Sequence, residues 1–148
     1  MQLTEHFTLN EFIRSATATL KGIDNTPNAG QLENIKKTAR QMEYVRALLG
    51  GYPIIISSGF RGAALNQAIG GSATSSHADG LAVDFTCPGF GCAEEVCLVL
   101  EKSTFKFDQI IYEQGHTNWC HLGFGKRMRQ EVLSWKQGKG YVFGVMDL

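Results

Sequence analysis

The sequence predicts an α+β fold in which a small antiparallel sheet is flanked by helices. Apolar residues recur at steps of three and four from about 29 to 49, a pattern typical of an amphipathic helix lying on a core. A β-branched run at 53–57 predicts a buried strand, and apolar runs at 107–113 and 118–124 predict a hairpin. Because these patterns alternate without a regular strand–helix–strand repeat, they favour α+β over a parallel α/β fold.

Local start and stop signals predict the remaining elements. Thr8 followed by Glu11 forms a capping box, which starts a short helix ending near residue 14. Residues 16–30 are expected to be a connecting loop, because two glycines and a proline interrupt them. Shorter patterns predict a helix at 62–69, a strand at 81–86, a helix at 94–102 and a last strand within 140–148.

Length and charge limit the classes of function. The 148 residues fit one domain, residues 1–148, and we expect a monomer. Fourteen basic residues balance fourteen acidic ones, so no broad charge favours nucleic acid or anionic lipid as a partner. A short basic cluster at Lys126, Arg127 and Arg129 is interpreted as a solvated loop, with help near an anionic cell wall as the alternative.

The start of the chain indicates no targeting segment. Residues 1–12, MQLTEHFTLNEF, carry acidic and polar side chains where a signal peptide has an apolar core. No apolar run approaches the roughly 18 residues that a membrane span requires. We therefore expect synthesis in the cytoplasm without a signal peptide, and no membrane insertion.

The four cysteines, Cys87, Cys92, Cys97 and Cys120, do not have the spacing of CxxC zinc knuckles. We expect them to be reduced and mostly buried. A Cys87–Cys92 disulfide and a zinc site made of thiolates are the alternatives.

His77, Asp84 and His121 are the candidate metal ligands. His77 and Asp84 flank the start of a predicted strand, and His121 lies within another, with Trp119 on its face and Cys120 on the opposite one. Two imidazoles and a carboxylate are a normal ligand set for a catalytic zinc that keeps one position open. Such a zinc lowers the pKa of a bound water and polarises a carbonyl, as amide hydrolysis requires. The spacing alone is a weak signal, since a histidine on a strand is more often a hydrogen-bonded core residue.

The segment SSGFRGAALNQAIGGSATSSHADGLAVDF resembles the segment that marks the zinc D-alanyl-D-alanine carboxypeptidase family of peptidoglycan peptidases. The N-terminal FTLNEFIRSATA stretch is similar to that of its small, often phage-encoded branch, and a later W-x-H element also matches. The matching residues are Ser58-Gly59-Phe60-Arg61, Asn66, Gly70-Gly71, Ser75, His77, Gly80, Ala82, Asp84 and Trp119-Cys120-His121.

This resemblance implies roles for four residues. It makes His77, Asp84 and His121 the ligands of a Zn²⁺ cofactor. Arg61 matches the family's arginine near the metal, which would hold a substrate carboxylate or carbonyl oxygen with its planar fork. A structural ion pair is the alternative role for Arg61.

The proton shuttle is less well defined. Many relatives have a glutamate three residues before the last zinc histidine, where this chain has Asn118. Another branch has a histidine five residues before it, which here is His116, and an imidazole is a suitable acid and base near neutral pH. Glu113 competes with it. A four-residue turn at 114–117 would pair Glu113 with Asn118 and point it away from His121, whereas a shift of one residue would turn it inward. We expect His116, with Glu113 as the alternative.

The resemblance implies a zinc metallopeptidase that hydrolyses the stem peptides of bacterial peptidoglycan, as a carboxypeptidase or an endopeptidase. Without a signal peptide or a wall-binding domain, it would be a bacteriophage endolysin or a virion-associated lysin. It would then act on the cell wall in the periplasm after delivery by a holin or a virion. The alternative is a non-catalytic binding or virion structural module that keeps the zinc fold.

Overall fold

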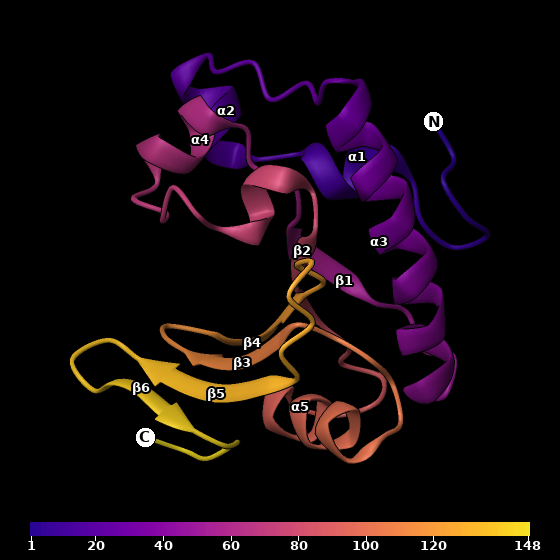
Figure 1. The fold of residues 1–148 in the computed structure, drawn as a ribbon, viewed down its shortest axis with the longest axis vertical. Coiled ribbons are helices and arrows are strands. Elements are labelled where there is room, and N and C mark those ends of the chain that lie inside the picture. Colours follow the sequence, from indigo (N-terminus) through magenta and orange to yellow (C-terminus); the bar gives the residue numbers. More distant parts are fainter.

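The computed structural model describes all 148 residues. The chain forms an α+β fold, as predicted, in which helices flank a six-stranded sheet (Figure 1). The helices are α1 (Leu9–Ile13), α2 (Ala16–Lys21), α3 (Ala29–Leu48), α4 (Ala63–Ala68), the 3₁₀ helix η1 (Ser76–Asp79) and α5 (Ala93–Lys102). The strands are β1 (Ile55–Ser58), β2 (Ala82–Thr86), β3 (Gln109–Gln114), β4 (Asn118–Gly123), β5 (Glu131–Lys136) and β6 (Gly140–Phe143).

The sheet has the strand order β1-β2-β4-β3-β5-β6 and is mixed. Four neighbouring pairs are antiparallel, as expected, but β5 runs parallel to β3. β5 was not among the predicted strands. It returns to the sheet after the loop that follows β4, and then pairs with β6 in the C-terminal ribbon seen at the lower left of Figure 1.

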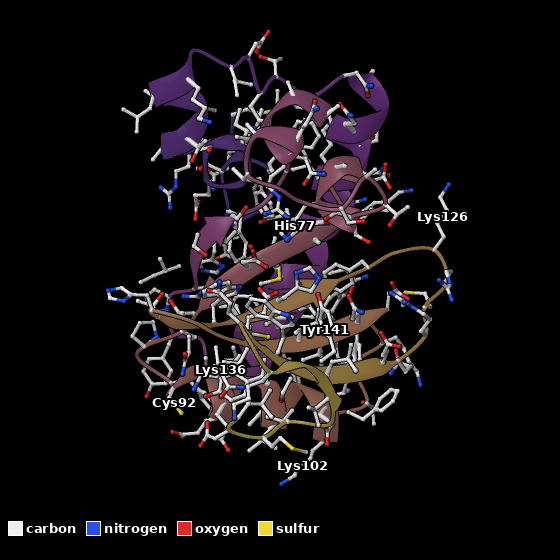
Figure 2. All side chains as sticks on the ribbon, turned by 90° about the vertical axis from the view of Figure 1, so that its left-hand side faces the viewer. His77, Cys92, Lys102, Lys126, Lys136 and Tyr141 are labelled. Atoms are coloured by element: carbon white, nitrogen blue, oxygen red, sulfur yellow. The ribbon has the colours of Figure 1, made fainter.

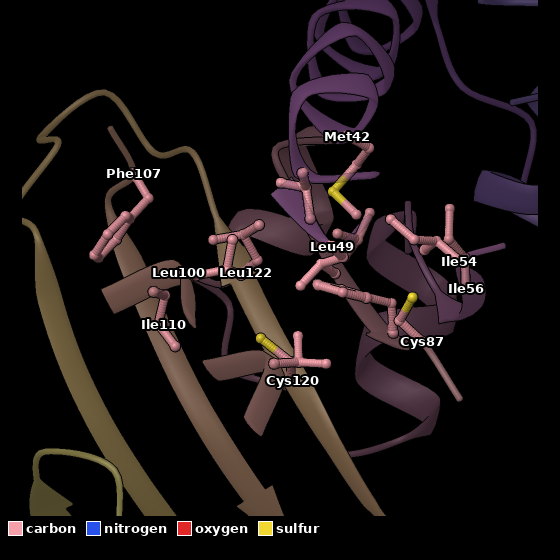
Figure 3. Close-up of a cluster of buried hydrophobic side chains, with 14 of the residues drawn as sticks. Met42, Leu49, Ile54, Ile56, Cys87, Leu100, Phe107, Ile110, Cys120 and Leu122 are labelled. Carbon is pink, nitrogen blue, oxygen red and sulfur yellow. The ribbon is translucent and has the colours of Figure 1, made fainter. Parts of the chain in front are cut away.

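One face of the sheet carries the apolar core. α5 packs against β3 and β4, and α3 lies alongside it. Figure 3 shows Met42 and Leu49 from α3 and its end, Leu100 from α5, and Ile110 and Leu122 from the sheet in one buried cluster. Because strand side chains alternate between faces, this arrangement leaves the neighbouring residues of β3 and β4 on the opposite, open face.

Two local predictions were wrong. Residues 16–21, expected within a loop, form α2, because the Ser15 hydroxyl accepts a hydrogen bond from the Ala18 N–H and Gly22 ends the helix in the left-handed conformation (φ 64°). β1 is an edge strand and is only half-buried: Ile56 lies in the core, whereas Ile55 is 51% exposed.

The β3–β4 hairpin has a tighter turn than the four-residue one considered above. Gln114 pairs with Asn118, so three residues form the turn, and Glu113 pairs with Trp119. This is the one-residue shift that turns Glu113 toward the face of His121.

None of the helices combines the length and the apolar character needed to span a membrane.

Candidate metal centre

Three elements bring His77, Asp84 and His121 together. Asp84 and His121 are direct partners on the antiparallel strands β2 and β4. His77 comes from η1, which ends at Gly80 just before β2. The hydroxyl of Thr38 on α3 donates a hydrogen bond to the Gly80 carbonyl oxygen at 2.7 Å, so the long helix supports the turn that carries His77. All three side chains are buried.

Their facing atoms form a small triangle. His77 Nε2 lies 3.2 Å from Asp84 Oδ1 and 3.2 Å from His121 Nδ1, and His121 Nδ1 lies 2.9 Å from Asp84 Oδ1. A tetrahedral zinc with ligand bonds of about 2.0–2.1 Å separates its ligand atoms by about 3.3 Å. The three residues therefore fit such an ion without rearrangement of the backbone.

The protonation of His77 supports a cation at this point. Its Nδ1–H donates to the Gly59 carbonyl oxygen at 2.6 Å, so the neutral ring presents a lone pair at Nε2. That lone pair faces a carboxylate oxygen and a second imidazole nitrogen, and three such atoms repel each other unless a proton or a metal ion lies between them. A backbone carbonyl that fixes the tautomer is also the usual support of a metal-binding histidine.

The pKa values of the three residues reflect this crowding. Burial acts to raise the pKa of Asp84, but the neighbouring imidazoles of His77 and His121 hold it well below its ordinary value. Burial lowers the pKa of His77. Burial acts in the same direction on His121, but the Asp84 carboxylate outweighs it and raises that pKa. Asp84 is therefore a carboxylate at neutral pH, as a metal ligand must be.

A close approach of two chain segments positions Arg61 beside this centre. The Phe60 N–H donates to the Phe12 carbonyl oxygen at 2.6 Å, and the Arg61 N–H donates to the His77 carbonyl oxygen at 3.0 Å. A Cβ atom on Gly59 would lie 2.6 Å from the Phe12 oxygen, so only glycine fits there. The same glycine carbonyl accepts the hydrogen bond from the His77 ring, so one turn serves both residues.

Arg61 is half-buried, and its Nε–H has no hydrogen-bond partner. Burial lowers the pKa of Arg61, although the negative charges of Asp84 and Glu113 act to raise it. No ion pair involves this side chain, so the structural ion pair considered as its alternative role is not formed. A guanidinium with a free buried donor next to a candidate metal centre is suited to hold an oxygen of a ligand.

A cavity of about 1040 Å³ opens over the centre. His77, Asp84 and His121 line it together with Arg61 and Glu113. A cleft of this size with a few converging polar groups is typical of a substrate site.

A family comparison agrees with this geometry. The family model described as Peptidase M15 matches residues 5–123. The chain belongs to the Peptidase M15 family. It is accordingly a zinc-dependent metallopeptidase at the level of the family, and the family resemblance inferred from the motifs is confirmed. A comparison with curated proteins finds no match.

The M15 match ends before the last strands, yet those strands help to build the cavity. Trp135 of β5 and Tyr141 of β6 line it, with ring centroids 6.3 Å apart, as do Lys126 and Arg127 of the loop after β4. Neither aromatic residue was predicted to belong to the site. The short run of apolar and β-forming residues Val132, Leu133 and Trp135 was the available signal, but the pairing of β5 with β3 is not local in sequence.

The two candidate proton shuttles occupy different surroundings. Glu113 is half-buried on the face that carries His121, and burial together with the Asp84 charge raises its pKa. His116 lies in the hairpin turn, is exposed, and is not among the residues that line the cavity. Asn118 points to the other face, where its amide donates to the Tyr112 hydroxyl at 3.2 Å.

The remaining candidates lie apart from the centre. Asp79 is exposed and is not part of the ligand group. All four cysteines are free thiols; three are buried and Cys92 is exposed. None belongs to a group that could hold a metal ion, so neither the disulfide nor the thiolate alternative is formed.

Proposed function

We propose that the protein is a zinc-dependent peptidase that hydrolyses peptide bonds in the stem peptides of bacterial peptidoglycan. The observation that carries the proposal is the convergence of three metal-ligand atoms, all within 4.8 Å of one another, at the floor of a large cavity in an M15 chain. Under this proposal His77, Asp84 and His121 are the zinc ligands. A zinc ion bound there would supply Lewis acidity toward the scissile carbonyl and toward water.

Glu113 is the better-supported proton shuttle. Its carboxylate lies on the cavity face of β3, and its raised pKa brings it closer to the neutral range in which a general base must also act as an acid. It would take a proton from the attacking water and return it to the leaving amine. His116 stays as the alternative, and it requires the hairpin turn to fold over the cavity.

Arg61 would hold an oxygen of the substrate. Its free Nε–H and its position next to His77 suit either the developing oxyanion or a carboxylate near the scissile bond. The Arg61 backbone N–H donates to the His77 carbonyl oxygen, so the base of the side chain has a fixed position beside the metal centre, while the guanidinium donors stay free for the substrate.

The biological setting follows from the motifs. Their similarity to the small phage-type branch supports an endolysin or virion-associated lysin, delivered to the wall by a holin or a virion. The cavity of about 1040 Å³ has room for several residues of a peptide, which fits an endopeptidase as well as a carboxypeptidase. We further propose that residues 1–148 act as one monomeric domain.

Purified protein tests the proposal directly. Zinc-loaded and zinc-stripped samples are incubated with isolated peptidoglycan, new amine and carboxyl ends are counted, and mass spectrometry of the fragments identifies the bond. We expect new ends only with zinc. Zinc-loaded protein that releases none would contradict the enzyme and would favour the non-catalytic wall-binding or virion module.

A further inference from the structure

The loop between β4 and β5, residues 124–130, places two cations in the lining of the cavity. Lys126 and Arg127 are exposed residues that line the same cavity as the candidate metal centre. Figure 2 shows Lys126 at the edge of the molecule, away from His77. Neither makes an ion pair or a side-chain hydrogen bond within the protein, whereas Arg129 in the same loop is fully engaged. The two free cations are therefore available to a ligand.

The loop is held in a fixed shape. Both oxygens of the buried Asp108 carboxylate accept hydrogen bonds from the Arg129 guanidinium at 2.9 Å, and Oδ1 also accepts one from its backbone N–H. The Gln130 side chain accepts a bond from the Phe107 N–H at 2.6 Å. These bonds maintain Met128 and Gln130 at positive φ (43° and 55°), an unfavourable conformation for residues other than glycine. A mobile solvated loop would not require such bonds.

No carboxylate of the cavity forms an ion pair with Lys126 or Arg127, although the charge of Arg127 acts on Asp108. Asp84 contacts the two imidazoles and Asp108 is paired with Arg129. Glu113 lies on the inner part of the sheet face, and Asp79 is the one other carboxylate of the lining. A ligand with an anionic group directed toward the loop would therefore meet two cations that no protein carboxylate pairs with.

We infer that Lys126 and Arg127 form a second anion subsite, which holds a carboxylate of the substrate peptide at a distance from the bond that is cut. The inference rests on the proposed function, because it takes the stem peptide as the ligand. In a stem peptide linked through the γ-carboxyl of D-glutamate, the α-carboxylate remains free inside the chain. That group is the ligand we assign to the loop, while Arg61 serves the oxygens next to the scissile bond. Since the family match ends at residue 123, the subsite belongs to the part of this chain that the family model does not describe.

Binding to matched peptides tests the subsite. The first probe is the peptide L-Ala-γ-D-Glu-L-Lys-D-Ala-D-Ala. In the second probe the α-carboxylate of D-Glu is replaced by a carboxamide. In the third probe only the C-terminal carboxylate is replaced by a carboxamide. Affinities are measured by calorimetry on zinc-loaded protein carrying Glu113→Gln, and kcat/KM on the wild-type background. We expect the first peptide to bind about tenfold better than the α-carboxamide, the effect of one charge-assisted hydrogen bond at a partly exposed site.

Variants of the loop locate the effect. Lys126→Gln combined with Arg127→Gln should abolish the preference, and each single change should reduce it. Lys102→Gln is the matched control, because Lys102 is exposed at the far end of the molecule, and it should leave the preference intact (Figure 2). Zinc content and thermal unfolding should be unchanged in all of these variants.

Several results would overturn the inference: equal binding of the first two peptides, no binding of any peptide, or an equal loss in Lys102→Gln, which would indicate long-range charge alone. If affinity fell only when the C-terminus was a carboxamide, the recognised anion would be the C-terminal carboxylate, and the assignment of the D-Glu α-carboxylate to the loop would be wrong. Failure of the proposed function appears differently. Zinc-loaded wild type that shows the preference but cleaves no peptide would contradict the peptidase and leave the subsite in place.

Discussion

Glu113 and Trp119 face each other across β3 and β4, and this pairing places the Glu113 carboxylate on the same face of the sheet as His121. With the alternative register, in which Glu113 faces Asn118, the carboxylate would lie on the opposite face of the sheet, which carries the apolar core. The position of a potential proton shuttle therefore depends on a difference of one residue in the length of a turn.

The first prediction concerns the shuttle. Glu113→Gln should lower kcat by about 10²–10⁴-fold with zinc retained, because the amide keeps the shape but cannot accept a proton. His116→Ala should stay within about twofold of wild type, since a group outside the cavity contributes little to the proton transfer. Hydrolysis of peptidoglycan fragments and zinc content are measured for both. The reverse pattern of losses would assign the role to His116.

The one-residue register illustrates what the sequence could and could not predict. His77 and Asp84 lie seven residues apart on a local turn and strand, so their proximity followed from the motif. The side on which Glu113 lies depends on the turn at 115–117, whose length the apolar pattern leaves undefined. β5 was not predicted from the sequence for a related reason. It is stabilised by parallel pairing with β3, a contact between segments with β4 and a loop between them.

A second prediction concerns the orientation of Arg61. Arg61→Lys keeps the charge but loses the planar fork and the Nε–H donor, so kcat/KM should fall by about 10–100-fold. Arg40→Lys, an exposed helix position, is the matched control and should have no effect. Kinetics on a soluble peptide with zinc content determined in parallel provide the measurement. An unchanged kcat/KM in Arg61→Lys would show that Arg61 acts only through its charge or not at all.

A third prediction concerns the turn under His77. Gly80 has φ 78°, and a Cβ atom there would lie 2.9 Å from Ile35 Cγ1 of α3. Gly80→Ala should therefore cost both backbone strain and steric overlap, about 2–4 kcal/mol of unfolding free energy. Gly138→Ala, at φ 83° with open space around it, should cost only the strain, about 1 kcal/mol. Urea denaturation compares the two. Equal costs would show that the approach to α3 is readily relieved.

The fourth prediction concerns pH and the ion pair between Asp108 and Arg129. Burial acts to raise the pKa of Asp108, but hydrogen bonds from Arg129 lower it overall. A carboxyl group with a lowered folded pKa adds stability above its unfolded pKa of about 3.9, and this is lost as the pH falls through the folded value. Asp108→Asn should therefore lower the unfolding free energy by about 2 kcal/mol at pH 7. This loss is smaller than that expected for a fully buried ion pair, because Arg129 is partly exposed.

The test of this ion pair is a comparison of urea denaturation of wild type and Asp108→Asn at pH 7 and at successively lower pH. The difference in unfolding free energy should be constant near neutrality and should shrink below about pH 4. Asp24→Asn, which removes an exposed aspartate from a loop, serves as the control with a small effect. A difference between wild type and Asp108→Asn that did not change with pH would contradict the assignment to the ion pair.

The location of the bound metal is the decisive test of the proposed metal centre. Crystals of the zinc-loaded protein, measured with anomalous diffraction at the zinc absorption edge, should show one strong peak bonded to His77 Nε2, His121 Nδ1 and an oxygen of Asp84. The expected bond lengths are about 2.0–2.2 Å. A fully loaded protein whose zinc peak lay elsewhere, on the cysteine sulfurs for example, would contradict the metal centre and the peptidase mechanism built on it.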